Sequence, residues 1–161
     1  MNEIIKIYFA DYKNEFLYFN LDAVSYDNQV LSGTFLLNKC PYLKIDSLIL
    51  NNTESIFILN QAQYIAIAYY LLETKQMNTD NLEECVKKLD FIVSKGCLAK
   101  FKKPVIKNES SLKFECHLNS IMIDHKNRMC YRVNVNICDG AYLLESDFIF
   151  LDQDLHHDGL K

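Results

Sequence analysis

Two polar side chains, Glu54 and Asn60, flank the start of the apolar segment Ile56 to Glu73. A carboxylate in an apolar setting can act as a general base toward water or an amine. An amide near a helix start can add one donor to the free backbone N–H groups that stabilise an oxyanion. The structural alternatives are a solvated loop carboxylate for Glu54 and a helix cap for Asn60. From the residues alone, these structural alternatives are favoured.

Lysines gather near one predicted strand end, and their charge suits binding of phosphate groups or of an acidic protein surface. Lysines at a strand end also protect a sheet edge from pairing with another chain. We favour the binding interpretation. The lysines concerned are Lys100, Lys102, Lys103 and Lys107.

The cysteines and histidines form neither a catalytic nor a metal-binding pattern. Cys116 and His117 are adjacent, but neighbouring residues of a strand point to opposite faces, so they cannot act as a pair. His156 and His157 lie in a polar tail, which is more often disordered than metal-binding. The six cysteines are scattered without a CxxC motif or zinc-ligand spacing. We therefore expect reduced thiols and no metal.

The elements that position Glu54 and Asn60 begin with a helix. Ile56 to Glu73 is apolar on nearly every side and contains no Gly or Pro, which is typical of a buried helix. An apolar stripe from Ile5 to Phe16 predicts a short amphipathic helix. A capping-box pattern at Asp80 and Glu83 predicts another over Asn81 to Leu89. The long apolar helix is therefore expected at the centre of the domain.

Strands surround this helix in the sequence. Val30 to Leu37 is the first predicted strand, and Asp139-Gly140 predicts a type I′ hairpin between the last two. Met129, Tyr131, Val133 and Val135 share one parity and are expected to face the helix. Order and alternation indicate an α+β domain in which a curled antiparallel sheet covers one central helix, the layout of the hot-dog fold. The four later strands are Phe91 to Phe101, Leu112 to Asn119, Met129 to Cys138 and Ala141 to Leu151.

Composition narrows the class of protein. The chain has 161 residues, of which 50% are apolar and 24% charged, as in one folded domain with a flexible tail from about residue 153. The net charge of −4 disfavours nucleic acid as a partner. The first ten residues mix Glu3 and Lys6 with apolar residues, and the longest apolar run, Ala62 to Leu72, is shorter than the roughly 20 residues that a bilayer requires. We expect a cytoplasmic protein that does not enter the membrane.

A resemblance to a known family adds to these patterns. Leu59 to Tyr64, following Cys40 to Leu43 and Glu54, resembles the FcoT-like branch of the hot-dog superfamily, whose central helix opens with an Asn-Gln pair and a nearby Tyr. Phe101 to Val105 resembles the basic-Pro step between strands of many hot-dog proteins. The likeness covers roughly residues 30 to 151. Ile49-Leu50 departs from it, since the family carries a His-Phe pair there.

This resemblance implies an enzyme that hydrolyses a fatty acyl thioester of coenzyme A or of an acyl carrier protein. In that enzyme Asn60 and Tyr42 polarise the thioester carbonyl and Glu54 activates the attacking group. Lys102 and Lys103 receive the phosphates of coenzyme A or the acidic helix of the carrier. The implied protein is a homodimer with acyl tunnels at the subunit interface, and it needs no cofactor beyond the acyl carrier.

Three other functions remain open at this stage. Related proteins of isonitrile lipopeptide pathways add glycine to an enoyl thioester. A non-catalytic acyl-binding protein would have the same fold, and a dehydratase is weakened by the lack of a histidine near the helix. Release of thiol, consumption of glycine, or binding without turnover distinguishes these readings.

Overall fold

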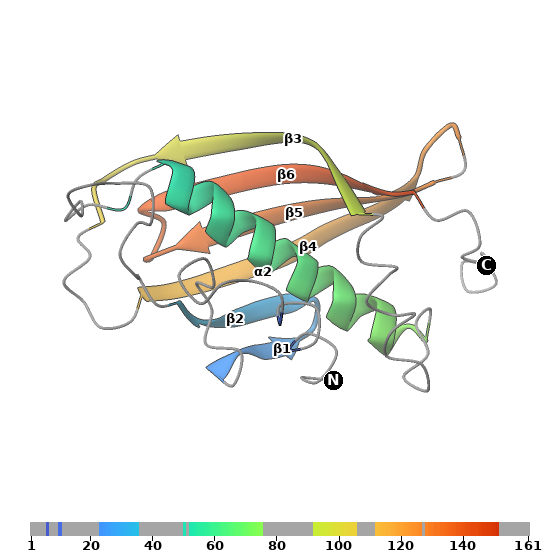
Figure 1. The fold of residues 1–161 in the computed structure, drawn as a ribbon, viewed down its shortest axis with the longest axis horizontal. Coiled ribbons are helices and arrows are strands. Elements are labelled where there is room, and N and C mark those ends of the chain that lie inside the picture. The colour runs from blue at the N-terminus through green and yellow to red at the C-terminus, as the bar shows by residue number, and fades with distance from the viewer. Residues whose placement is uncertain are drawn as a thin grey trace.

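The computed structural model describes residues 23–35, 50, 52–75, 92–105, 112–126 and 128–151, together with residues 6 and 10 (Figure 1). The helices predicted near the N-terminus and over residues 81–89, and the predicted C-terminal tail, lie outside the described residues. The elements are β1 (Ser25–Asp27), β2 (Val30–Phe35), α2 (Asn52–Glu73), β3 (Ile92–Phe101), β4 (Leu112–Ile123), β5 (Met129–Ile137) and β6 (Tyr142–Phe150).

The described strands form one antiparallel sheet in the order β1-β2-β4-β5-β6-β3. Helix α2 crosses one face of this sheet diagonally, with its first turn beside the end of β3 (Figure 1). β3 lies at one edge because it pairs with β6 rather than with β4, its neighbour in the chain. This arrangement confirms the predicted α+β architecture of a curled sheet over one central helix.

The alternation of β5 explains how the sheet and the helix pack. Met129, Tyr131, Val133 and Val135 are all at most 5% exposed. Tyr131 packs edge-on against Tyr70 of α2, with ring centroids 6.0 Å apart. The prediction that this face of β5 covers the helix is therefore confirmed, and burial of these side chains is the main favourable term in docking the two elements.

Helix α2 begins at Asn52, four residues before the predicted start. Ala62, Ala66 and Ala68 are fully buried, and such small side chains let a helix approach its neighbours closely. Within the described part of the chain, the stretch Thr53–Glu73 is long and apolar enough to cross a membrane, with a mean hydropathy of 1.2. Because 78% of its most apolar window is buried, it also has the properties of a core helix.

The hairpin between β5 and β6 has the predicted turn residues at its tip. The Ala141 amide donates to the Cys138 carbonyl oxygen at 3.1 Å, which closes a turn around Asp139 and Gly140. Their φ angles are +52° and +82°, and a type I′ turn requires positive φ at both positions. Cys138 also has a positive φ, and its amide bonds to Lys113 of β4, so the paired strands end one residue earlier, at Ile137 and Tyr142.

Replacing Gly33 with alanine should destabilise the fold, because β2 passes close to its neighbours there. A Cβ at Gly33 would lie 2.9 Å from the Ala23 carbonyl oxygen and 3.2 Å from the Phe114 ring. We expect the free energy of unfolding to fall by about 1–3 kcal/mol, as overpacking generally costs, measured by urea denaturation. Gly96→Ala is the matched control, since a Cβ there meets nothing within 4 Å. Equal urea midpoints for the two variants would contradict the prediction.

Candidate functional site

Glu54 is a completely buried carboxylate in the first turn of α2. The expectation that it lies before the helix, and the favoured alternative of a solvated loop carboxylate, are both wrong. The helix opens at Asn52 with polar residues that look like loop in the sequence, so Glu54 is its third residue. An acidic side chain in a first turn is favoured by the positive end of the helix dipole. Because Glu54 is shielded from solvent, it remains a candidate general base.

Tyr142 of β6 lies within electrostatic range of Glu54. Its hydroxyl donates to the Leu50 carbonyl oxygen at 2.7 Å, and the Leu50 amide donates to the Val105 carbonyl oxygen at 2.9 Å. Burial raises the pKa of Tyr142, a backbone hydrogen bond from Val105 opposes the rise, and the negative charge of Glu54 adds to it. These hydrogen bonds connect Leu50, just before α2, to Val105 after β3 and to Tyr142 of β6. Glu54 follows Leu50 by four residues.

Lys102 and Lys103 are exposed at the same end of the sheet. The Lys102 amide donates to the Ala141 carbonyl oxygen at 2.9 Å, and the ring of Phe101 packs edge-on against Tyr142 at 4.8 Å between centroids. Lys102 and Lys103 therefore follow the end of β3 that packs against Ala141 and Tyr142, and Tyr142 is within electrostatic range of Glu54. Lys100 is exposed on the face of β3 opposite to Phe101, and Lys107 lies outside the described residues.

Asn60 is the ninth residue of α2 and is half-buried. The prediction that it sits beside free backbone N–H groups is therefore wrong, and so is the cap alternative, because backbone amides this far into a helix bond to preceding carbonyls. Asn60 lies about 9 Å along the helix from Glu54 and about 120° around it, from ideal helix geometry. The structure does not bring the two side chains together on one face of α2.

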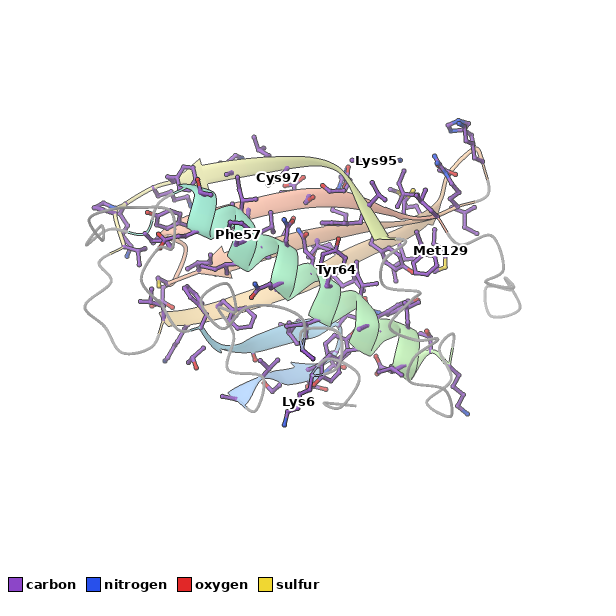
Figure 2. The ribbon with its side chains drawn as sticks, in the orientation of Figure 1. Lys6, Phe57, Tyr64, Lys95, Cys97 and Met129 are labelled. Atoms are coloured by element: carbon purple, nitrogen blue, oxygen red, sulfur yellow. The ribbon has the colours of Figure 1, made fainter. Side chains whose placement is uncertain are left out.

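The surroundings of Asn60 differ from those of Glu54. Phe57 and Tyr64, both labelled in Figure 2, precede and follow Asn60 in the sequence. Their helical spacing places the three residues on one half-buried face of α2. The amide is thus flanked by two aromatic rings that offer apolar surface. Tyr42, the third predicted catalytic residue, lies outside the described residues.

Two buried glutamines of α2 were not singled out as candidates from the sequence. Gln61 is 2% exposed and lies seven residues after Glu54, on the same face of the helix. Gln63 is 0% exposed, and neither its amide nitrogen nor its amide oxygen has a hydrogen-bond partner among the described residues. The feature of the sequence that could have indicated them is the presence of amide side chains in an otherwise apolar helix. Unsatisfied buried amides are costly, so Gln63 is an unusual residue for this helix.

Cys116 and His117 point to opposite faces of β4, as predicted. Cys116 is fully buried on the helix side, where burial raises the pKa of its thiol far above the ordinary value, whereas His117 is partly exposed. Within the described ranges, no group of three His, Cys, Asp or Glu side chains could hold a metal ion. His156 and His157 lie outside these ranges.

Comparison with known proteins supports the fold. No protein-family model matches the chain, and no curated protein is significantly similar to it in sequence. A thioesterase superfamily protein from Shewanella loihica PV-4 superimposes with a TM-score of 0.53 at 5% identity, over 80% of this chain and 90% of that one. Cj0977, a sigma28-regulated virulence protein from Campylobacter jejuni, gives 0.52 at 10% identity, over 89% and 91%.

At these identities the likeness establishes the fold alone. The chain has the hot-dog fold, with a curled antiparallel sheet around a central helix, as in the Shewanella structure. The narrower FcoT-like resemblance stays a prediction, since no family model matches.

Proposed function

We propose that the protein processes acyl thioesters by hydrolysing an acyl-CoA or acyl-carrier-protein substrate. The observation that carries this proposal is Glu54, a fully buried carboxylate in the first turn of the central helix of a hot-dog fold. Carboxylates are rarely fully buried, and a carboxylate shielded from water in an apolar setting can serve as a general base. The Shewanella neighbour is described as a thioesterase superfamily protein, which supports the same class of reaction.

The proposed chemistry assigns one role to each polar group. Glu54 takes a proton from water as the water oxygen bonds to the thioester carbonyl carbon. Asn60 and Tyr42 donate hydrogen bonds to the carbonyl oxygen, which becomes negatively charged. The C–S bond then breaks, and the thiolate leaves and takes up a proton. Phe57 and Tyr64 would contact the acyl chain beside Asn60.

Because Glu54 and Asn60 leave the helix in different directions, we propose that two subunits complete one site. The chain has an edge suited to such an association. β3 is a 10-residue edge strand whose apolar side chains Val93, Leu98 and Phe101 are 45%, 54% and 42% exposed. Long exposed apolar edges tend to pair with another chain.

The protein should therefore be a dimer at micromolar concentration, measured by light scattering. Leu98→Lys places a charge on the edge and should shift the equilibrium toward monomer. Lys113→Gln, a change on an exposed residue of β4, is the control and should leave the dimer intact. A monomeric wild-type protein would refute the two-subunit site.

A direct assay tests the reaction itself. The purified protein is incubated with acyl-CoA thioesters of several chain lengths, and release of free thiol is followed over time. Thiol release supports hydrolysis. Glycine-dependent loss of an enoyl thioester would instead support addition, and tight binding of acyl-CoA without turnover would identify a binding protein.

Replacing Lys102 and Lys103 with glutamine should raise KM for acyl-CoA about 3–10-fold with little change in kcat, because the two exposed charges attract phosphates before the chemical step. High salt should raise KM for the wild type and have less effect on the double variant. Lys113→Gln is again the control. Acyl-pantetheine, which lacks the nucleotide phosphates, should be processed equally by wild type and variant, and an equal defect with both substrates would contradict phosphate binding.

A further inference from the structure

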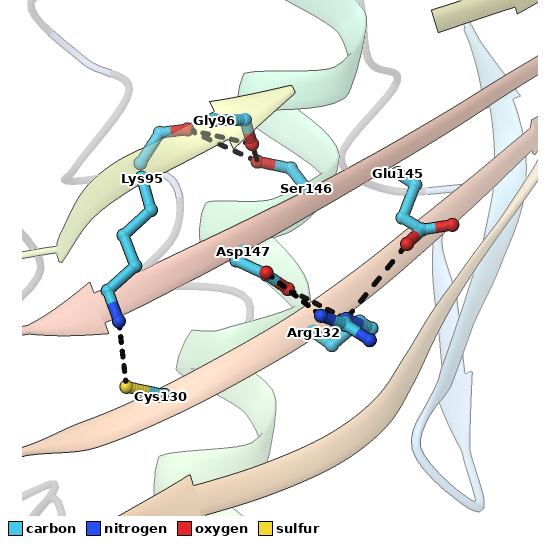
Figure 3. A network of polar contacts seen from close by, with 8 residues as sticks. Lys95, Gly96, Cys130, Arg132, Glu145, Ser146 and Asp147 are labelled. Carbon is cyan, nitrogen blue, oxygen red and sulfur yellow. Dashed lines mark hydrogen bonds and ion pairs between the residues drawn. The ribbon is translucent and has the colours of Figure 1, made fainter. Parts of the chain in front are cut away.

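Lys95 of β3 and Cys130 of β5 meet on the face of the sheet that points away from α2 (Figure 3). The Lys95 Nζ lies 3.6 Å from the Cys130 Sγ. β6 runs between these two strands, so the lysine side chain spans one strand to reach the thiol. The contact therefore joins the edge strand to the third strand from that edge.

A β-bulge directs Lys95 toward Cys130. Ser94 and Gly96 pair with the consecutive residues Phe148 and Asp147, which leaves Lys95 as the extra residue of β3. The Ser146 hydroxyl donates to the Gly96 carbonyl oxygen at 2.6 Å and fastens the bulge. Bulges commonly re-aim a side chain in this way, so the position of Lys95 is built into the strand pairing.

The carboxylates nearest this pair are held by arginines. Asp147 accepts two hydrogen bonds from Arg132, at 2.8 and 3.0 Å, and Asp124 accepts two from the side chain of Arg128, at 3.0 and 2.6 Å. The guanidinium groups thus hold both acids, the charge of Lys95 also helps to lower the pKa of Asp147, and the Cys130 sulfur lies 3.6 Å from the Lys95 Nζ.

A hollow of about 160 Å³ opens beside the pair and is lined by Lys95, Cys130, Met122 and Asp147 among others. Cys130 is 6% exposed, so this hollow is the approach to its sulfur. The volume admits a peroxide molecule. Two nucleophiles, an amine and a thiol, therefore share one access route for a small oxidant.

We propose that Lys95 and Cys130 are a modification site at which hydrogen peroxide generates a covalent S–N cross-link. The Cys130 sulfur attacks one peroxide oxygen while the thiol proton passes to the other oxygen; the O–O bond breaks, and a sulfenic acid and water form, so sulfur loses two electrons and peroxide gains them. The deprotonated Lys95 amine then attacks the sulfur. The S–N bond forms as the S–O bond breaks, and the departing hydroxide takes the amine proton to leave as water.

Cys116 and Cys97 differ from Cys130 in burial and position. Cys116 is fully buried on the helix side, and burial raises the pKa of its thiol. Cys97 is exposed, and desolvation raises the pKa of its thiol as well. The cross-link would tie the edge strand β3 to β5 across β6, so it should also raise the Tm of the oxidised protein.

The test oxidises the full-length reduced protein with hydrogen peroxide and measures intact mass and peptide maps. The expected product has lost two hydrogen atoms, contains a peptide that joins β3 to β5, and returns to the starting mass with dithiothreitol. Lys95→Arg and Cys130→Ser should abolish the joined peptide, whereas Cys97→Ser should leave it.

Two outcomes would overturn the proposal. A loss of two hydrogen atoms that persists in Lys95→Arg would identify a disulfide. Oxygen addition at Cys130 without a joined peptide, in a wild-type protein whose circular dichroism is unchanged, would show that the amine does not capture the sulfur. Both readouts are independent of thioester turnover.

Discussion

Glu54→Gln should lower kcat for an acyl thioester by about 10² or more while leaving the binding of acyl-CoA nearly unchanged, because glutamine keeps the shape of the side chain and cannot accept a proton. The Glu54 side chain is fully buried in the first turn of α2, so the substitution removes a carboxylate that is shielded from solvent. The measurements are kcat by thiol release and Kd for a non-hydrolysable acyl-CoA analogue.

The pH dependence gives a second readout of the same variant. A general base works only as the deprotonated carboxylate, so kcat of the wild type should fall as the pH falls, and this acid limb should disappear in Glu54→Gln. A residue with a purely structural role would leave the limb in place.

Glu73→Gln is the matched control, since Glu73 is an exposed carboxylate at the other end of the same helix. Loss of a shielded negative charge from a first turn costs up to about 2 kcal/mol of stability. Urea denaturation separates this effect from catalysis. Wild-type turnover in a folded Glu54→Gln variant would show that the base lies elsewhere.

Asn60→Ala should lower kcat by about 10²–10³, the usual cost of removing one oxyanion donor, with little change in binding. Asn60 lies between Phe57 and Tyr64 on the half-buried face of α2, where an amide can reach a ligand without disturbing the packing against the sheet. Asn119→Ala, which removes an exposed amide from β4, is the control and should keep full activity.

Mixing the two inactive variants tests whether one site uses two subunits. If Glu54 and Asn60 of different subunits form each site, a Glu54→Gln/Asn60→Ala heterodimer contains one intact site and one doubly altered site. An equal mixture that exchanges subunits should then recover about a quarter of the wild-type activity, from the statistics of a symmetric dimer. No recovery after demonstrated exchange would place both residues of a site in the same subunit.

Much of the fold followed from local patterns. The period-2 alternation of Met129 to Val135 predicted which face of β5 meets the helix, and the all-apolar segment predicted that α2 is central. Asp139-Gly140 predicted the hairpin tip, because positive φ at both turn positions is a local requirement. Such features depend on neighbouring residues, so they can be read from the chain.

Tertiary structure decided the features that depend on distant residues. The helix start at Asn52, the burial of Glu54 beside Tyr142 and the placement of Asn60 in the third turn were not evident from local sequence. Whether a carboxylate is solvated depends on the tertiary packing around it, and Tyr142, whose pKa the charge of Glu54 helps to raise, lies 88 positions later in the chain.

The same reason applies to the other chemical features of the molecule. The contact of Lys95 with Cys130 exists only because β3 pairs with β6 at the edge of the sheet and carries a bulge. The chain by itself determined the central helix, the five longer strands and the class of fold, since hydrophobic period and turn chemistry act locally; the short strand β1 was not predicted. Which polar groups are buried, and which nucleophiles meet, was decided by strand order and packing, because these contacts join residues that are distant in the sequence.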